Sequence, residues 1–209
     1  MFSSLFRKLW LLGLLLAGAS LTFGSAVAQD AAPTAVVERF HATLITNMKN
    51  GKALGFDGRT AKLTPVVKET FDIPTMARIS TGAAWGKMSE AEHADIIAAF
   101  TAWTVANYAG NFSAFDGESF ETKSQSPDDG KGNILVNTLL KPNGMAPVAF
   151  NYRMQKIGGS WKVVDIYLDG AISQLATFRA QFAAVLKQGS AADLVAHMKR
   201  LAAEAKKET

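Results

Sequence analysis

The stretch WKVVDIYLDGAISQLATFRAQF, Trp161 to Phe182, has the pattern of a buried strand, a sharp corner and an amphipathic helix. Its first part, residues 163–168, is rich in β-branched and apolar side chains, which favours a strand. Asp169 and Gly170 interrupt that run, and the carboxylate of Asp169 can accept hydrogen bonds from the free amides of the next helix. The apolar residues that follow recur at helical spacing: Ile172, Leu175, Phe178, Phe182 and Val185. The strand and the helix should therefore present apolar side chains to one interior.

The first 28 residues have the pattern of a secretory signal peptide. A short basic region, Arg7-Lys8, precedes an apolar stretch at residues 9–17, and Ala26-Val27-Ala28 supplies the small-x-small cleavage pattern. The apolar stretch is short for a bilayer span, and a retained N-terminal anchor is the alternative. We predict export to the periplasm with cleavage near Ala28-Gln29, which leaves residues 29–209 as a single domain.

Composition excludes several classes of protein. The sequence has no cysteine, so disulfide bonds, thiolate metal ligands and thiol catalysis are absent, and packing must supply the stability. The whole chain has 22 basic and 18 acidic residues, and loss of the leader lowers its formal charge to about +2. So weak a charge, without a basic stripe, does not indicate a nucleic-acid interface.

The hydrophobic pattern changes from helical to extended about halfway along the chain. Helical spacing occurs at residues 36–48, 60–82 and 89–108, and the last of these begins with a capping box at Ser89. Four segments of strand character follow, separated by Asp-Gly, Asn-Gly and Gly-Gly turn signals: residues 118–126, 132–141, 145–157 and 160–168. Two helices, residues 171–187 and 191–204, complete the pattern.

This order of segments predicts an α+β fold. We expect N-terminal helices, a four-stranded antiparallel meander, and two C-terminal helices packed on one face of the curved sheet. A concave sheet that helices cover commonly encloses a cavity, and with weak charge the ligand that fits is apolar. The residues predicted to line this apolar pocket are Phe71, Met76, Ile79, Trp85, Phe100, Trp103, Tyr108, Val148, Phe150, Tyr152, Ile166, Leu168, Ile172 and Leu175.

The titratable side chains do not predict a catalytic or metal site. Each of the three histidines lies on a separate predicted helix: His41, His93 and His197. Asp165 and Asp169 share one side of a strand and its corner, and a cap and a rim residue are the commoner roles for such a pair. We predict no catalytic residue, no metal and no cofactor. The alternative is a small pocket enzyme, isomerase-like or dehydratase-like, that uses Asp165 and Tyr152.

A third reading is a structural or adaptor protein whose apolar side chains simply fill a closed core. The absence of a cavity above about 300 Å³ would favour that reading. The size of the cavity therefore distinguishes a ligand-binding pocket from a closed hydrophobic core.

Two patterns occur in order along the chain. The first, within FDIPTMARISTGAAWGKMSEAEHADIIAAF, consists of Phe71, Asp72, Met76, Ala77, Gly82, Trp85 and Phe100. The second, within VVDIYLDGAISQLATFRAQF, consists of Val163, Asp165, Asp169, Gly170, Ser173, Arg179 and Phe182. Together they resemble the motifs of the MlaC-type family of periplasmic lipid-binding proteins, also called toluene-tolerance auxiliary proteins.

The resemblance implies a carrier that binds a phospholipid in its pocket and shuttles it between inner- and outer-membrane complexes. Such a carrier would serve an ABC-type or related transport system that maintains outer-membrane lipid asymmetry. The segments after residues 50 and 108 look more like the branch associated with hopanoid biosynthesis, so a hopanoid-type cargo, or an accessory role in that biosynthesis, is also expected. Arg153 and Arg179 are predicted at the rim, beside the lipid headgroup. We expect a monomer whose only bound molecule is the lipid.

Overall fold

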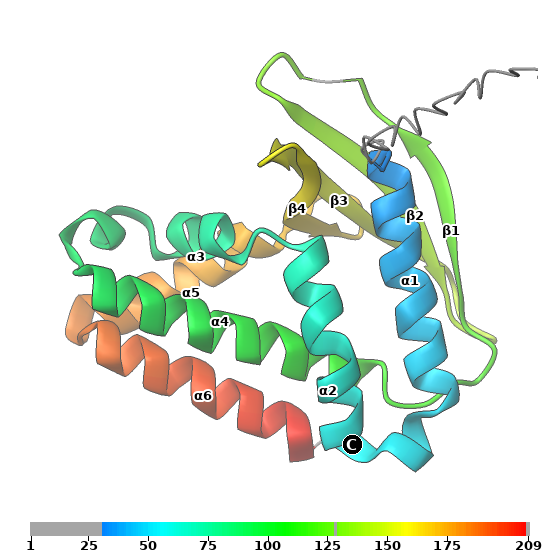
Figure 1. Cartoon of the computed structure of the whole chain (residues 1–209), viewed down its shortest axis with the longest axis horizontal. Helices are drawn as coiled ribbons and strands as arrows, with labels where there is room; N and C mark the ends of the chain where they lie inside the picture. The colour runs from blue at the N-terminus through cyan, green and yellow to red at the C-terminus, as the bar shows by residue number, and fades with distance from the viewer. Residues whose placement is uncertain (1–30, 128, 208–209) are drawn as a thin grey trace, which may run out of the picture.

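The chain forms helices first, a curved antiparallel sheet next and two further helices last, as Figure 1 shows. The computed structural model describes residues 31–127 and 129–207, so the predicted signal peptide lies outside the described residues. The helices are α1 (Pro33–Lys49), α2 (Gly51–Thr70), α3 (Ile73–Thr81), the 3₁₀ helix η1 (Gly82–Lys87), α4 (Glu90–Asn111), α5 (Gln174–Gln188) and α6 (Ala191–Lys207). The strands are β1 (Ser119–Gln125), β2 (Asn133–Lys141), β3 (Val148–Ile157), β4 (Ser160–Leu168) and β5 (Ile172–Ser173).

The strands pair in chain order as one antiparallel sheet, which confirms the predicted meander. The prediction of four strands omitted the two-residue strand β5. Asp169 and Gly170 both adopt positive φ, 48° and 78°, and turn the chain back so that Ile172 pairs with Leu168. For this reason α5 begins at Gln174 instead of residue 171.

The helices cover one face of the sheet in two layers. In Figure 1, α1 lies along the sheet, whereas α3, α4, α5 and α6 extend away from it. The predicted capping box starts α4, because Ser89 and Glu92 exchange hydrogen bonds between side chain and backbone. The two C-terminal helices differ in their packing. Helix α5 contacts β4 and β5, but α6 packs chiefly on α4, and a Cβ on Gly110 of α4 would lie 2.8 Å from the carbonyl oxygen of Ala205.

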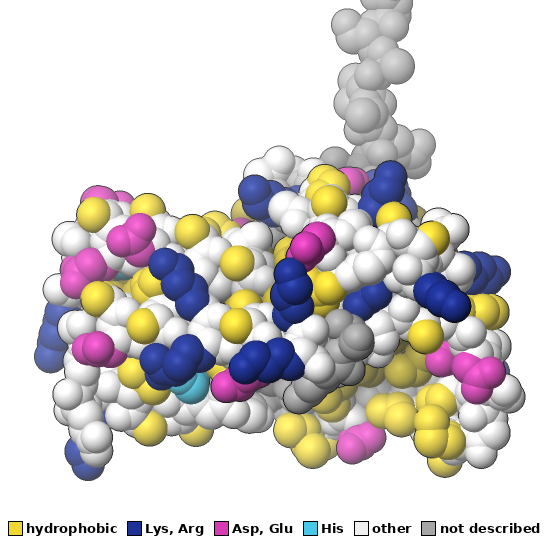
Figure 2. All heavy atoms as spheres, turned by 90° about the horizontal axis from the view of Figure 1, so that it is seen from below, with side chains coloured by type: hydrophobic (Ala, Val, Ile, Leu, Met, Phe, Trp, Pro, Cys, Tyr) yellow, Lys and Arg dark blue, Asp and Glu magenta, His cyan; other side chains and the backbone are white. Residues whose placement is uncertain are grey.

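The outer surface of the helical half is mixed in character. Figure 2 shows apolar side chains interspersed with Lys and Arg over this half of the molecule. No helix in the described part of the chain has both the length and the hydropathy that crossing a bilayer requires.

A buried polar pair lies where α1 meets the sheet. Nε2 of His41 and the hydroxyl of Tyr152 form a hydrogen bond of 2.9 Å, and the imidazole stacks on Phe120 with 3.9 Å between ring centroids. His41 is only 4% exposed, and burial lowers the pKa of its imidazole from 6.5 to about 3. The folded protein therefore holds His41 neutral throughout the mildly acidic range.

A buried carboxylate joins β4 to α5. Oδ1 of Asp165 accepts from the backbone amides of Ile166 at 2.8 Å and Leu175 at 3.1 Å, and Oδ2 accepts from the hydroxyl of Ser173 at 2.7 Å. Ser173 itself accepts from the amide of Ala176 as the N-cap of α5. The expectation that Asp169 caps this helix is therefore wrong. Its positive φ places Asp169 in the turn, where it is exposed, and the first amides of α5 are capped by Ser173 and by Asp165 of β4.

We expect Asp165→Ala to destabilise the protein by about 2 to 4 kcal/mol, because it leaves the start of α5 without its charged acceptor. Urea unfolding measures this change. Asp169→Gly is the matched control: it removes a carboxylate four residues away but suits the positive φ, so stability should stay the same or rise slightly. Equal losses in the two variants would contradict the assignment of the cap.

We also expect His41 to make stability depend on pH. The pKa of His41 is lower in the folded protein, so between pH 6.5 and about pH 3 the imidazole is protonated in the unfolded chain and neutral in the folded protein. The contribution is thus complete above pH 6.5 and is lost as pH falls toward 3, at a rate of roughly 1 kcal/mol per pH unit. Urea unfolding of wild type and His41→Gln at several pH values isolates the effect. Both proteins contain the same Asp and Glu residues, so the difference between their pH profiles comes from His41. Parallel pH profiles for the two proteins would refute it.

Candidate functional site

The strand and the helix of the opening stretch form one side of a cavity between the sheet, α3, α4 and α5. Its volume is about 220 Å³, which is below the bound of about 300 Å³ taken above, so its size favours the closed-core reading, whereas its lining favours a ligand. Its walls are mainly apolar, and the lining residues are Phe71, Met76, Trp103, Thr104, Asn107, Tyr108, Asn111, Phe112, Phe150, Ile166, Leu168, Gln174 and Phe178.

The structure brings half of the predicted pocket residues to this cavity: Phe71, Met76, Trp103, Tyr108, Phe150, Ile166 and Leu168. They come from the loop before α3 and from α3, α4, β3 and β4. In the sheet, Phe150 pairs with Leu168 and Tyr152 with Ile166, so these side chains share the face that the helices cover. As contacts to a lipid, the lining residues remain a prediction.

Three other predicted pocket residues are buried in the hydrophobic core and do not line the cavity. Phe100 is fully buried and packs edge-on against Trp103, with 5.5 Å between ring centroids. Leu175 is buried beneath the first turn of α5, and Tyr152 is occupied by its hydrogen bond to His41. Helical spacing identifies the inner face of a helix, but it does not separate a cavity wall from the layer behind it.

The remaining four predicted residues do not line the cavity either. Ile172 is 53% exposed, because it belongs to β5 and not to the helical face on which we had placed it. Trp85 stacks on His93 with 3.9 Å between ring centroids, at the start of α4. Ile79 on α3 and Val148 at the beginning of β3 are partly buried elsewhere.

The cavity also has a polar strip that the sequence analysis missed. Thr104, Asn107 and Asn111 lie on α4, and Gln174 adds a further amide from the first turn of α5. Residues 104, 107, 108 and 111 fall at helical spacing on a single face, which was the signal that could have identified them. Phe112 and Phe178 complete the missed lining.

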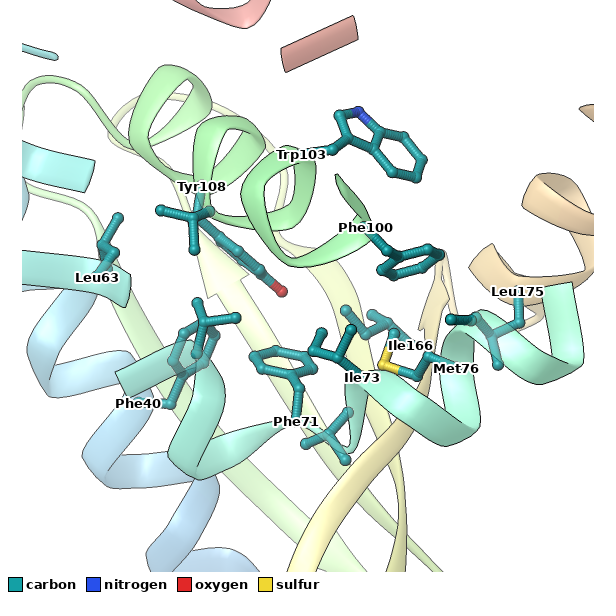
Figure 3. Packing of buried hydrophobic residues seen from close by; sticks show 14 of the residues in the cluster. Phe40, Leu63, Phe71, Ile73, Met76, Phe100, Trp103, Tyr108, Ile166 and Leu175 are labelled. Atoms are coloured by element: carbon teal, nitrogen blue, oxygen red, sulfur yellow. The ribbon is translucent and has the colours of Figure 1, made fainter. Parts of the chain in front are cut away.

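Tyr108 contributes a buried hydroxyl to the lining. Its side chain is 7% exposed, and its hydroxyl has no hydrogen-bond partner. Burial raises the pKa of this phenol well above 10, so the hydroxyl keeps its proton. Figure 3 shows the ring leaving α4 with the hydroxyl directed toward the space beside Phe71 and Ile166.

The two arginines predicted at the rim lie away from the cavity. Arg153 pairs with Asp165 across β3 and β4, and its Nη2 lies 3.7 Å from the Oδ2 of that carboxylate. Arg179 is exposed on α5, and its Nε lies 3.2 Å from the position that a Cβ on Gly82 would occupy. The described lining of the cavity therefore contains no cationic side chain.

The structure does not bring together the residues of the enzyme alternative. The pairs Tyr152–Ile166 and Arg153–Asp165 are successive in the ladder, so Tyr152 and Asp165 point to opposite faces of the sheet. Within residues 31–127 and 129–207, no group of three or more His, Asp and Glu side chains is placed to hold a metal ion.

A larger hollow of about 920 Å³ lies outside this site, between α2, α4 and α6. Its floor consists largely of Ala and Thr side chains of α4, such as Ala98, Thr101 and Ala102. It is a groove on the helical surface and shares no residue with the lining of the cavity.

Comparisons with known proteins identify a family and a solved structure of similar fold. The family model described as MlaC protein matches residues 38–200. No curated protein matches the chain. Among solved structures, the chain is similar to a phospholipid-binding protein from Ralstonia solanacearum, determined in complex with a phospholipid. The similarity has a TM-score of 0.73 and 22% sequence identity, and it covers 84% of this chain and 99% of that one. At this identity the similarity shows a common fold.

Two phenylalanines one turn apart on α5 test whether the cavity is a binding space. Phe178 lines it and is partly exposed, whereas Phe182 is fully buried and does not line it. We expect Phe182→Ala to cost about 3 to 5 kcal/mol of stability, and Phe178→Ala to cost less. Phe178→Ala should also strengthen the binding of the apolar dye N-phenylnaphthylamine, because it widens the cavity. Titration of dye fluorescence measures this, and unchanged or weaker dye binding by Phe178→Ala would contradict the assignment.

Proposed function

Because the chain belongs to the MlaC protein family, we propose that it is a carrier that holds the apolar part of one lipid in the cavity between the sheet, α3, α4 and α5. The observation that carries the proposal is the cavity itself, where apolar side chains from helices and strands surround a space that the core leaves open. The fold shared with a protein solved with a phospholipid supports it. Burial of an alkyl chain gains about 0.8 kcal/mol per methylene, so no covalent step is needed to retain the lipid.

The size of the cavity implies that one of its walls moves when the lipid enters. A volume of about 220 Å³ is small for a two-chain lipid, since pockets for drug-sized ligands already measure about 300 to 1,000 Å³. Helix α5 is the wall that is easiest to displace. It buries only Leu175 and Phe182, whereas α4 buries eight side chains in the middle of the helical layers. In this proposal α5 moves outward to admit the cargo, and α4 stays in place.

The carrier would work in the periplasm after removal of residues 1–28. A lipid is too apolar to cross an aqueous compartment alone, so a protein that covers its chains allows exchange between inner- and outer-membrane complexes. An ABC-type or related transport system is the expected setting, with the protein acting as a monomer and without catalysis. Phospholipid and hopanoid-type lipids are the two proposed cargo classes.

Quenching of tryptophan fluorescence tests where the lipid lies. Trp85, Trp103 and Trp161 are the tryptophans of residues 29–209, and only Trp103 lines the cavity. In the double variant Trp85→Phe with Trp161→Phe, a phospholipid with brominated acyl chains should quench Trp103 strongly. In the control that keeps only Trp85, the emission should change little, because Trp85 stacks on His93 away from the cavity.

Two outcomes would count against the carrier. Equal quenching of Trp85 and Trp103 would place the chains outside the cavity. Repeated native mass spectra of gently purified protein without bound lipid would argue against lipid carriage, and a spectrum with lipid would identify its class after extraction.

A further inference from the structure

The two buried tyrosines of the core, Tyr108 and Tyr152, differ in the hydrogen bonding of their hydroxyls. Tyr152 is fully buried, and its hydroxyl is hydrogen-bonded to Nε2 of His41 at 2.9 Å. Tyr108 is 93% buried, lines the cavity, and leaves its hydroxyl without a partner. Because a buried hydroxyl that lacks a partner loses its hydration without compensation, such a group calls for an explanation.

The phenylalanine rings that pack against Tyr108 carry no acceptor. Its ring packs against three phenylalanine rings, with 4.9 Å between centroids for Phe40, 5.8 Å for Phe71 and 5.9 Å for Phe112. The hydroxyl points away from α4 toward the space beside Phe71 and Ile166 (Figure 3). No described residue accepts from this hydroxyl and it is closed to solvent, so we look for its acceptor in a ligand that displaces a wall of the cavity.

The chemistry of that acceptor follows from the rest of the lining. The polar strip of Thr104, Asn107 and Asn111 lies on the same face of α4 as Tyr108, and none of its side chains is charged. Neutral hydroxyls and amides suit an uncharged polar group better than a phosphate, which would favour a cation. A molecule with a carbonyl next to long apolar chains satisfies both the strip and the apolar walls.

We propose that Tyr108 is a specificity-determining residue whose hydroxyl donates to an acyl-ester carbonyl of the bound lipid. This inference rests on the proposed lipid-carrier function and selects its cargo class, which is ester-linked glycerolipids. An ether-linked lipid has no carbonyl at that depth. A hopanoid-type polycyclic lipid places ring hydrocarbon there, and it would leave the Tyr108 hydroxyl unpaired.

Two lipids that differ only in their linkage test the inference: a diacyl phosphatidylglycerol and its dialkyl ether analogue with the same chains. We expect wild type to bind the ester about tenfold more tightly, which is the usual effect of one buried hydrogen bond that is lost. Tyr108→Phe should bind both lipids equally. Without lipid, the variant should melt at the same temperature as wild type or higher, because it removes an unpaired hydroxyl.

Tyr152→Phe is the matched control. It removes the hydroxyl that already has a partner, so it should lower the melting temperature and keep the preference for the ester. Equal binding of the two lipids by wild type would overturn the inference, and so would a preference for the ester that survives in Tyr108→Phe. If wild type bound neither lipid, the proposal of a phospholipid cargo would fail, and the inference with it.

Discussion

The hydrogen bonds of Asp165 attach the helix that closes the cavity to the sheet that forms its floor. The carboxylate accepts from the amides of Ile166 on β4 and Leu175 on α5, and from the hydroxyl of Ser173 between them. A negative charge at the N-terminus of α5 also interacts favourably with the helix dipole. Because Gln174 and Phe178 line the cavity from this helix, the position of their wall depends on one buried side chain.

The cavity results from incomplete packing of aromatic side chains between the sheet and the helices. Aromatic rings such as Phe40, Phe71 and Tyr108 meet edge to face, and such large flat side chains do not fill every space between a curved sheet and straight helices. One buried hydroxyl, that of Tyr152, is satisfied within this core, and that of Tyr108 is not. A proposed ligand site and the hydrophobic core are thus continuous, and the unpaired hydroxyl lies where the two meet.

Local signals predicted the elements well where they act over a few residues. The capping box at Ser89 starts α4, and the turn signals between strands produce the antiparallel meander. The prediction of pocket residues was less complete. Phe100 and Trp103 have the same helical pattern and both pack against Phe178 of α5, but only Trp103 borders the cavity, and periodicity does not show this difference. Asn107 and Asn111 were overlooked because a polar side chain is usually assigned to solvent, and their position beside a cavity depends on the opposite wall.

The sequence by itself determined the order of helices and strands, the antiparallel pairing and the apolar character of the interior. Periodicity, caps and tight turns are properties of neighbouring residues, and they act before distant segments meet. The tertiary structure decided which carboxylate caps α5, which face of α4 borders a cavity, and which tyrosine hydroxyl remains unpaired. These outcomes depend on contacts between residues far apart in the chain, such as Asp165 with Leu175 and His41 with Tyr152, and they exist only once the sheet and the helices have packed.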